Sequence, residues 1–194
     1  MNHSRTHSVA VIGAGPYGLS IAAHLRAHGV DFRIFGTPMY SWQAHMPAGM
    51  FLKSEGCASS LSEPTGYYTL KQYCADEGLT YGEHGIPVSG AVFSQYGLSF
   101  QKRLVPTVED TMVTALDNLS GSFELHLASG EKVRTKKVVV ATGLSNTAHI
   151  PSALAHLPPE LLSHSSRHHD LSRFTGRDVT VRSEERRVGK ECRL

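Results

Sequence analysis

In the first third of the chain, the pattern of hydrophobic and polar residues shows short apolar runs on either side of one helical stretch. Ser8–Ile12 is a short run rich in β-branched residues, which predicts a buried parallel strand. A stretch with small residues such as Ala22 and Ala23 follows and ends at Gly29, as expected of a helix lying close against a sheet. A second apolar run, Val30–Phe35, predicts another strand. The sequence therefore begins with a strand, a helix and a strand.

The middle of the chain predicts a loop insertion and two helices. Residues 37–64 are rich in turn residues and aromatics, and we expect a loop that packs over a ligand or under a helix. Residues 69–77 predict a short helix that ends at Gly78. Residues 88–104 predict a second helix, capped at or near Ser89. Its apolar stripe, which we interpret as core, consists of Val92, Phe93, Tyr96, Phe100 and Leu104.

Strand patterns return in the last half of the chain. Three short runs predict an antiparallel meander, at residues 111–116, 122–128 and 131–135. Residues 138–143 then predict a buried parallel strand that ends in a turn of small residues. Residues 177–181 predict the beginning of another buried strand.

Three glycines between the first predicted strand and helix have the spacing G-x-G-x-x-G. Gly13 permits a tight turn, Gly15 lets the backbone approach a pyrophosphate, and Gly18 lets helix and strand pack closely. The helix N-terminus adds free N–H groups and a positive dipole end. No Lys-Ser or Lys-Thr follows Gly18, which excludes a Walker A loop. The sequence thus predicts an α/β, Rossmann-like FAD/NAD(P)-binding domain, with a parallel sheet flanked by helices and an antiparallel β-meander.

The choice of dinucleotide depends on two further positions. In many such folds an acidic residue at the end of the second strand holds the ribose, but here that position holds Gly36, and Asp31 lies at the other end of the strand. NAD therefore gains no support from this strand. Pro16 makes the loop resemble the G-x-G-P-x-G-L loops of flavoprotein oxidoreductases, which favours FAD.

Composition and charge narrow the possible partners. The hydrophobic content of 40% and aromatic content of 8% are typical of a globular chain. Five of the 19 basic and three of the 17 acidic residues follow Val181, so the rest of the chain carries 14 of each. No apolar run approaches the roughly 20 residues of a membrane helix, and the first strand begins too early for a signal peptide. We therefore expect a cytoplasmic protein with neither a nucleic-acid nor a membrane partner.

The cysteines and histidines do not form a recognisable metal or redox motif. The three cysteines are odd in number and include no C-x-x-C pair, and we interpret Cys57 and Cys74 as small buried side chains. The densest histidine group, His164, His168 and His169, lacks a companion carboxylate or cysteine pattern at zinc spacing. We expect a solvated, turn-rich segment there and no metal site.

Three stretches together resemble one enzyme family. They are Gly13–Leu19, Glu63–Tyr73 and Ala141–Gly143. The second is similar, with departures at several positions, to the D-P-T-S-P-[FY]-[ST]-F-L-N-Y run of lysine and ornithine N-hydroxylases. With the meander, these stretches resemble the FAD half of the class B flavin-dependent monooxygenases, which include the flavin-containing monooxygenases and those N-hydroxylases. The resemblance spans about residues 8–181.

The resemblance implies a domain organisation. Residues 1–181 correspond to the FAD-binding domain, with a helical and loop insertion at about 37–106 and the meander at about 111–135. The family continues with a second glycine fingerprint that seats NADPH, whereas residues 182–194 include eight charged residues in thirteen and no glycine pair. We therefore interpret residues 182–194 as a non-native, disordered tail and the NADPH domain as missing.

The resemblance also implies a reaction. In the family, NADPH reduces FAD, and the reduced flavin uses oxygen to oxygenate a soft nucleophile such as an amine or a sulfide. The expected cofactors are FAD and NADPH, and the expected partner is a small-molecule substrate. No catalytic residue is assigned, and we expect this chain alone to be inactive.

Candidate cofactor-binding residues follow by position from the same resemblance. The residues expected to hold the FAD pyrophosphate are Gly13, Gly15, Pro16, Tyr17 and Gly18. Val113 is expected to meet the adenine through its backbone, and Gly36 occupies the ribose position. The residues expected near the flavin are Trp42, Lys53, Ala141, Thr142 and Gly143. For Lys53, an exposed lysine extended over apolar surface is an equal alternative.

Three functions remain open from the sequence. The first is the FAD-binding part of an NAD(P)H-dependent monooxygenase. The second is another FAD-dependent pyridine-nucleotide oxidoreductase with the same fold, because fold does not fix reaction. The third is a non-catalytic dinucleotide-binding module. A purified protein that is yellow from bound flavin would exclude the third.

Overall fold

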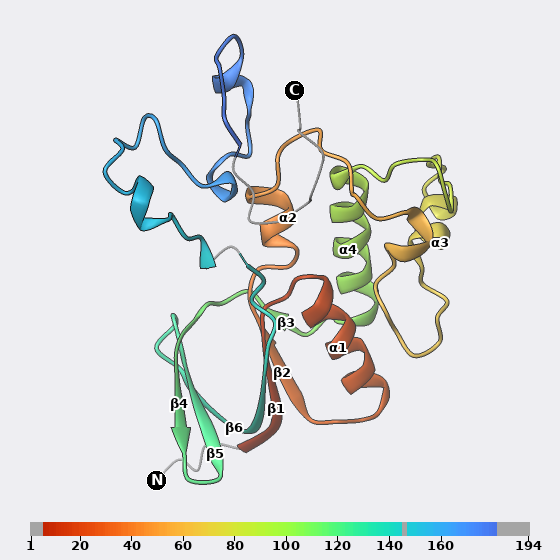
Figure 1. Cartoon of the computed structure of the whole chain (residues 1–194). Helices are drawn as coiled ribbons and strands as arrows, with labels where there is room; N and C mark the ends of the chain where they lie inside the picture. The colour runs from red at the N-terminus through yellow and green to blue at the C-terminus, as the bar shows by residue number, and fades with distance from the viewer. Residues whose placement is uncertain (1–5, 145–146, 182–194) are drawn as a thin grey trace.

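A six-stranded sheet forms the centre of the computed structural model, which describes residues 6–144 and 147–181 (Figure 1). Its order is β3-β2-β1-β6-β5-β4. The strands are β1 (Thr6–Ile12), β2 (Phe32–Phe35), β3 (Val108–Glu109), β4 (Val113–Leu119), β5 (Ser122–Leu127) and β6 (Lys132–Val140). The α-helices are α1 (Pro16–Ala27), α2 (Tyr40–Ala44), α3 (Leu70–Asp76) and α4 (Gly90–Leu104). Short 3-10 helices lie at Gly56–Ala58, Ser152–Leu154, Ser165–Arg167 and Ser172–Phe174.

The sheet has a parallel half and an antiparallel half. Strands β1, β2, β3 and β6 pair in parallel, and β4, β5 and β6 form the antiparallel meander. The register of the parallel half aligns the last residues of its strands, with Ile12 opposite both Phe35 and Val140, and Phe35 opposite Glu109. The predicted α/β architecture with a meander is confirmed, and the carboxyl ends of the four parallel strands share one edge.

Alternating side chains of β1 enter two different cores. Val9 and Val11 join Leu19 of α1 and the aromatic residues of α4 on one face of the sheet. Ala10 packs on the other face with Phe35 and with apolar side chains of the meander, namely Leu125, Leu127 and Val133. Figure 1 shows α1 and α4 on one side of the parallel strands and β4 and β5 on the other. The period-two alternation of the first strand therefore positions the helical layer and the meander.

The helices of the insertion begin and end where their capping residues predict. The hydroxyl of Thr69 accepts the N–H of Gln72 at the start of α3, and the hydroxyl of Ser89 accepts the N–H of Val92 at the start of α4. The predicted stripe of α4 is largely buried, with Tyr96 and Phe100 at 0% exposure. Both helix predictions are confirmed to within two residues.

Several strand predictions were wrong. The two runs predicted as 131–135 and 138–143 form one continuous strand, β6, because residues 132–135 pair with β5 while residues 134–140 pair with β1 on the other side. Residues 177–181 form no strand, and Val181 is 74% exposed, because no neighbouring strand takes their hydrogen bonds in the described chain. The short elements α2 and β3 lie in stretches for which no helix or strand was predicted.

The segment after β6 returns to the loop that follows α2. The N–H of Ala48 donates to the carbonyl of His169, and the ring of His45 is 3.0 Å from the carbonyl oxygen of Ser166. His168 is buried with its ring edge against Phe174. The predicted tail, residues 182–194, lies outside the described residues. No helix in the part of the chain described here is both long enough and apolar enough for a membrane crossing.

Candidate functional site

Two of the three fingerprint glycines are required by close packing. Gly13 follows β1 with a φ of 110°, and its N–H donates to the carbonyl of Phe35. A Cβ on Gly13 would lie 2.2 Å from the carbonyl oxygen of Ala141, and a Cβ on Gly18 would lie 1.8 Å from the carbonyl oxygen of Gly13. No side chain fits at either position, so these glycines hold β1, α1 and the end of β6 together.

Gly15 differs from its two neighbours because the space above it is open. A Cβ there would meet no atom within 4 Å. Gly15 is the N-cap of α1, no side chain caps this helix, and Pro16 occupies its first turn. Helix geometry leaves the N–H groups of Tyr17 and Gly18 without intrahelical acceptors, and the Tyr17 side chain is 81% exposed. The arrangement is an open, uncapped helix N-terminus of the kind that receives a phosphate.

The turn after β6 lies beside the glycine loop. The N–H of Ala141 donates to the carbonyl of Ile12, and its carbonyl faces Gly13. Thr142 and Gly143 continue this turn, and both are exposed. The structure therefore brings Ala141, and with it the Ala141–Gly143 turn, to the edge that carries the glycine loop.

The ribose position at the end of β2 is shaped for glycine. Gly36 has a φ of 125°, a region that side chains other than glycine adopt only with strain. Its N–H donates to the carbonyl of Glu109, and a Cβ would lie 3.4 Å from the nitrogen of Ala14. The backbone conformation at this position therefore disfavours the acidic side chain that many such folds carry there.

The remaining predicted residues lie on separate elements. Trp42, on α2, packs its ring 4.5 Å from that of Phe93 on α4. Val113 begins β4 and packs against the smaller core. Lys53 is exposed, in a loop stretch that includes the buried Gly56. Within the described residues, none of these three side chains forms a hydrogen bond or an ion pair with the glycine loop.

Sequence reasoning missed one polar pair at this edge. The hydroxyl of Thr37, directly after Gly36, donates to Oδ1 of Asp110 at 2.5 Å. Asp110 follows β3, which has only two residues and therefore shows no alternation that could identify it as a strand. The pair depends on strand pairing between β2 and β3, which the sequence does not reveal.

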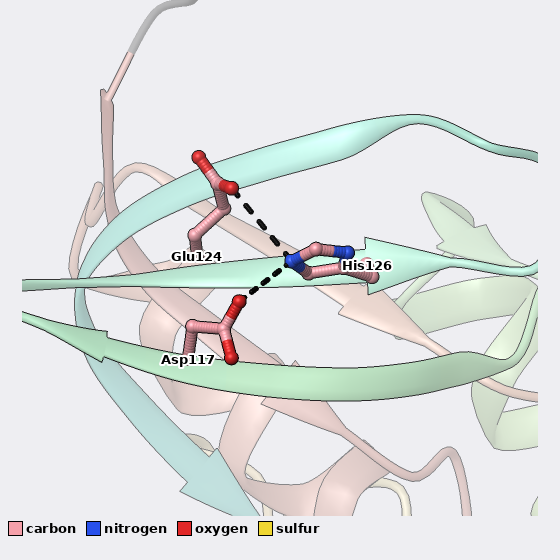
Figure 2. Close-up of side chains that lie close together, drawn as sticks. All are labelled: Asp117, Glu124 and His126. Atoms are coloured by element: carbon pink, nitrogen blue, oxygen red, sulfur yellow. Dashed lines mark hydrogen bonds and ion pairs between the residues drawn. The ribbon is translucent and has the colours of Figure 1, made fainter.

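A histidine–carboxylate cluster lies on the meander, on β4 and β5. Nε2 of His126 is 2.8 Å from Asp117 and 3.7 Å from Glu124 (Figure 2). Arg134 and Lys132 also pair with Glu124, and their hydrogen bonds lower the pKa of that carboxyl. We interpret the cluster as a surface salt-bridge network between neighbouring strands.

The histidine group near the end of the described chain is engaged in local hydrogen bonds. Nδ1 of His164 accepts the N–H of Ser166, and Nε2 of His168 is 2.6 Å from the hydroxyl of Ser163. The ring of His169 is 2.5 Å from the carbonyl oxygen of Met46. These contacts order turns in the segment, which agrees with the turn-rich interpretation, although His168 is buried and not solvated.

Solved structures share this fold. A flavin-containing monooxygenase from Stenotrophomonas maltophilia matches with a TM-score of 0.69 and 21% identity, over 88% of this chain and 49% of that one. OTEMO, solved with FAD and NADP, matches with a TM-score of 0.58 and 21% identity, over 77% of this chain and 28% of that one. The bacillithiol disulfide reductase Bdr (YpdA) from Staphylococcus aureus matches with a TM-score of 0.57 and 17% identity, over 72% and 39%.

These structures confirm, at the level of fold, the resemblance to flavin monooxygenases. The chain spans less than half the length of each of the three. A search of the curated proteins finds no match. The sequence profile of the pyridine nucleotide-disulphide oxidoreductases, by contrast, matches residues 7–181. Because this profile matches most of the chain and the structure forms the glycine loop, the chain belongs to the pyridine nucleotide-disulphide oxidoreductase family.

Proposed function

We propose that this chain is the FAD-binding part of an NAD(P)H-dependent flavoprotein monooxygenase that oxygenates a small nucleophilic substrate, an amine or a sulfide. The observation that carries the proposal is the open space over Gly15 at the uncapped N-terminus of α1. Neighbouring backbone fills the space beside Gly13 and Gly18, so of the three glycines only Gly15 leaves room for a ligand. This cradle fits a pyrophosphate, which needs N–H donors and an approach without a Cβ.

The residues around the cradle have distinct roles in this proposal. The amides of Tyr17 and Gly18 donate to the pyrophosphate, and the turn Ala141–Gly143 borders the path toward the flavin. Trp42 and Lys53 lie toward the flavin, and Val113 meets the adenine through its backbone. When bound, FAD supplies electron transfer from NAD(P)H and activation of oxygen, while the protein binds and orients the cofactor and excludes water.

The cysteines support oxygenation over disulfide reduction. Cys57 and Cys74, the two cysteines described by the structure, are free thiols and lie on different elements. Cys57 is exposed, whereas Cys74 is buried, which corrects the prediction that both are buried, and burial raises the pKa of the Cys74 thiol. A thiol of raised pKa is a poor nucleophile for disulfide exchange. The monooxygenase from S. maltophilia also covers more of this chain than the disulfide reductase does.

The test is a flavin titration of the wild type and of Gly15→Val. The added side chain meets no protein atom within 4 Å, so the fold is retained at a cost of about 1 kcal/mol for a poorer N-cap, while the pyrophosphate is obstructed. Ala27→Val, at the exposed end of the same helix, is the matched control and is expected to bind FAD as the wild type does. Far-UV circular dichroism checks the fold, and the change in flavin fluorescence reports binding.

Two results would count against the proposal. Equal FAD affinity in Gly15→Val and in the wild type would show that the glycine loop is not the pyrophosphate site. A folded wild type that binds no FAD would contradict the proposed function itself.

A further inference from the structure

The carboxyl end of β2 raises a specific problem for a ribose. In folds of this type an acidic side chain near this point accepts hydrogen bonds from the ribose hydroxyls. Here the position is Gly36, whose backbone conformation disfavours any side chain. A ribose bound beside the glycine loop therefore needs its acceptor from another strand.

Strand pairing supplies a candidate. The N–H of Gly36 donates to the carbonyl of Glu109 at 2.9 Å, so the end of β2 lies directly beside the end of β3. The next residues along the two strands also meet, because the hydroxyl of Thr37 donates to Oδ1 of Asp110 at 2.5 Å. The carboxylate of Asp110, directly after β3, is thereby held one residue beyond the position where β2 lacks one.

The acidic residue that ends β3 and the one that directly follows it, Glu109 and Asp110, are not equivalent. Glu109 is engaged by the guanidinium of Arg33 through both of its oxygens, and Arg33 also binds Glu131 of the meander. Asp110 forms no ion pair with another residue in the described part of the chain, and it is exposed at the sheet edge. Its bond to Thr37 uses Oδ1 and leaves Oδ2 as an acceptor. Asp110 is therefore the carboxylate of this pair that a ligand can reach.

We propose that Asp110, oriented by Thr37, is the ribose-binding carboxylate of this site and takes the place of the acid that Gly36 excludes. The adenosine ribose of FAD presents two neighbouring hydroxyl donors, and a carboxylate with a free oxygen accepts from such a pair. The Thr37 oxygen, whose proton goes to Asp110, offers a further acceptor. This inference rests on the proposed FAD function and adds to it the residues that recognise the ribose.

The experiment compares Asp110→Asn with the wild type by calorimetric titration of FAD, ADP, 2′-deoxy-ADP and 3′-deoxy-ADP. Asparagine keeps the shape but removes the charge and one acceptor. We expect Asp110→Asn to bind FAD and ADP roughly tenfold to hundredfold more weakly, the size expected for hydrogen bonds to a charged group. The wild type prefers ADP to at least one deoxy analogue, and the variant loses that preference. Asp117→Asn, an exposed carboxylate of the meander, is the matched control and leaves all four affinities unchanged.

The outcomes separate this inference from the proposed function. If the wild type binds FAD and Asp110→Asn binds it equally well, or keeps the preference for ADP, Asp110 is not the ribose ligand and the FAD proposal stands. If the folded wild type binds no FAD, both proposals fail. Thr37→Val tests whether Thr37 orients Asp110. We expect this variant to lose affinity for the same ligands, but less than Asp110→Asn does.

Discussion

The hydroxyl of Tyr96 provides the sharpest test of how the helical layer is held to the loop insertion. Tyr96 is fully buried on α4, donates to the carbonyl of Tyr68 at 2.7 Å and accepts the N–H of Leu61 at 3.1 Å. Burial raises the pKa of Tyr96, so the phenol remains a donor at any ordinary pH. Tyr96→Phe keeps the ring and its packing but leaves two buried backbone groups without partners.

The magnitude follows from those two groups. An unsatisfied buried polar group costs about 1–3 kcal/mol, so two such groups give about 2–6 kcal/mol. Because single substitutions rarely cost more than about 4 kcal/mol, we expect Tyr96→Phe to lower the free energy of unfolding by about 2–4 kcal/mol. For a chain of this size that corresponds to a fall in Tm of roughly 5–15 °C. The single tryptophan, Trp42, packs against Phe93 in the same core, so its fluorescence during urea unfolding reports on this layer directly.

Tyr40→Phe is the control, because Tyr40 is 52% exposed and we expect a change within about 0.5 kcal/mol. Both variants are measured without flavin, since a bound ligand would add its own stabilisation. If Tyr96→Phe unfolds at the same urea concentration as Tyr40→Phe, with an unchanged slope, the buried hydrogen bonds do not contribute as described.

Two further predictions concern the glycine loop and a buried carboxylate. Gly18→Ala places a Cβ 1.8 Å from a backbone oxygen, so we expect a loss of stability well above the ~1 kcal/mol that alanine gains in a helix. Gly15→Ala meets no neighbouring atom and is expected to lose only about 1 kcal/mol, from the poorer N-cap; thermal denaturation compares the two variants. Burial opposes ionisation of Glu63, but hydrogen bonds from Tyr68, Thr65 and Tyr67 outweigh it and lower its pKa. Because the folded pKa lies below the unfolded value, this stabilisation is present at neutral pH and is lost as the pH falls through the folded pKa. Glu63→Gln should therefore weaken the fall in the free energy of unfolding at acidic pH, measured by unfolding at a series of pH values. An identical pH dependence in the variant and the wild type would contradict the assignment.

The features that could be predicted from the sequence are those encoded by neighbouring residues. The spacing of Gly13, Gly15 and Gly18 specifies a strand–turn–helix whose constraints lie within a few residues, and the structure has it. The cap at Ser89 and the helical period after it likewise define α4. In each case the physical cause is local, so the pattern suffices.

The features that were missed depend on contacts between distant segments. Residues 177–181 have the composition of a strand, but a strand requires a partner that composition does not supply. The Thr37–Asp110 pair exists because two short strands align in register, 73 residues apart in the chain. The motif itself predicts that Gly15 faces open space and that Gly18 packs against backbone. The tight contact of Gly13 with Ala141 joins distant segments, so only the fold reveals it.

The continuity of β6 has a consequence for the order in which this protein assembles. The meander forms between strands that follow one another closely in the chain, so its hairpins close small loops and can form early. Pairing of β6 with β1 joins segments more than a hundred residues apart, at a much larger entropic cost. The glycine loop is near the start of the chain and is therefore synthesised before Ala141, the residue against which Gly13 packs. The dinucleotide cradle is completed only when the last strand of the sheet docks, and a ligand that needs it cannot assist the earlier steps of folding.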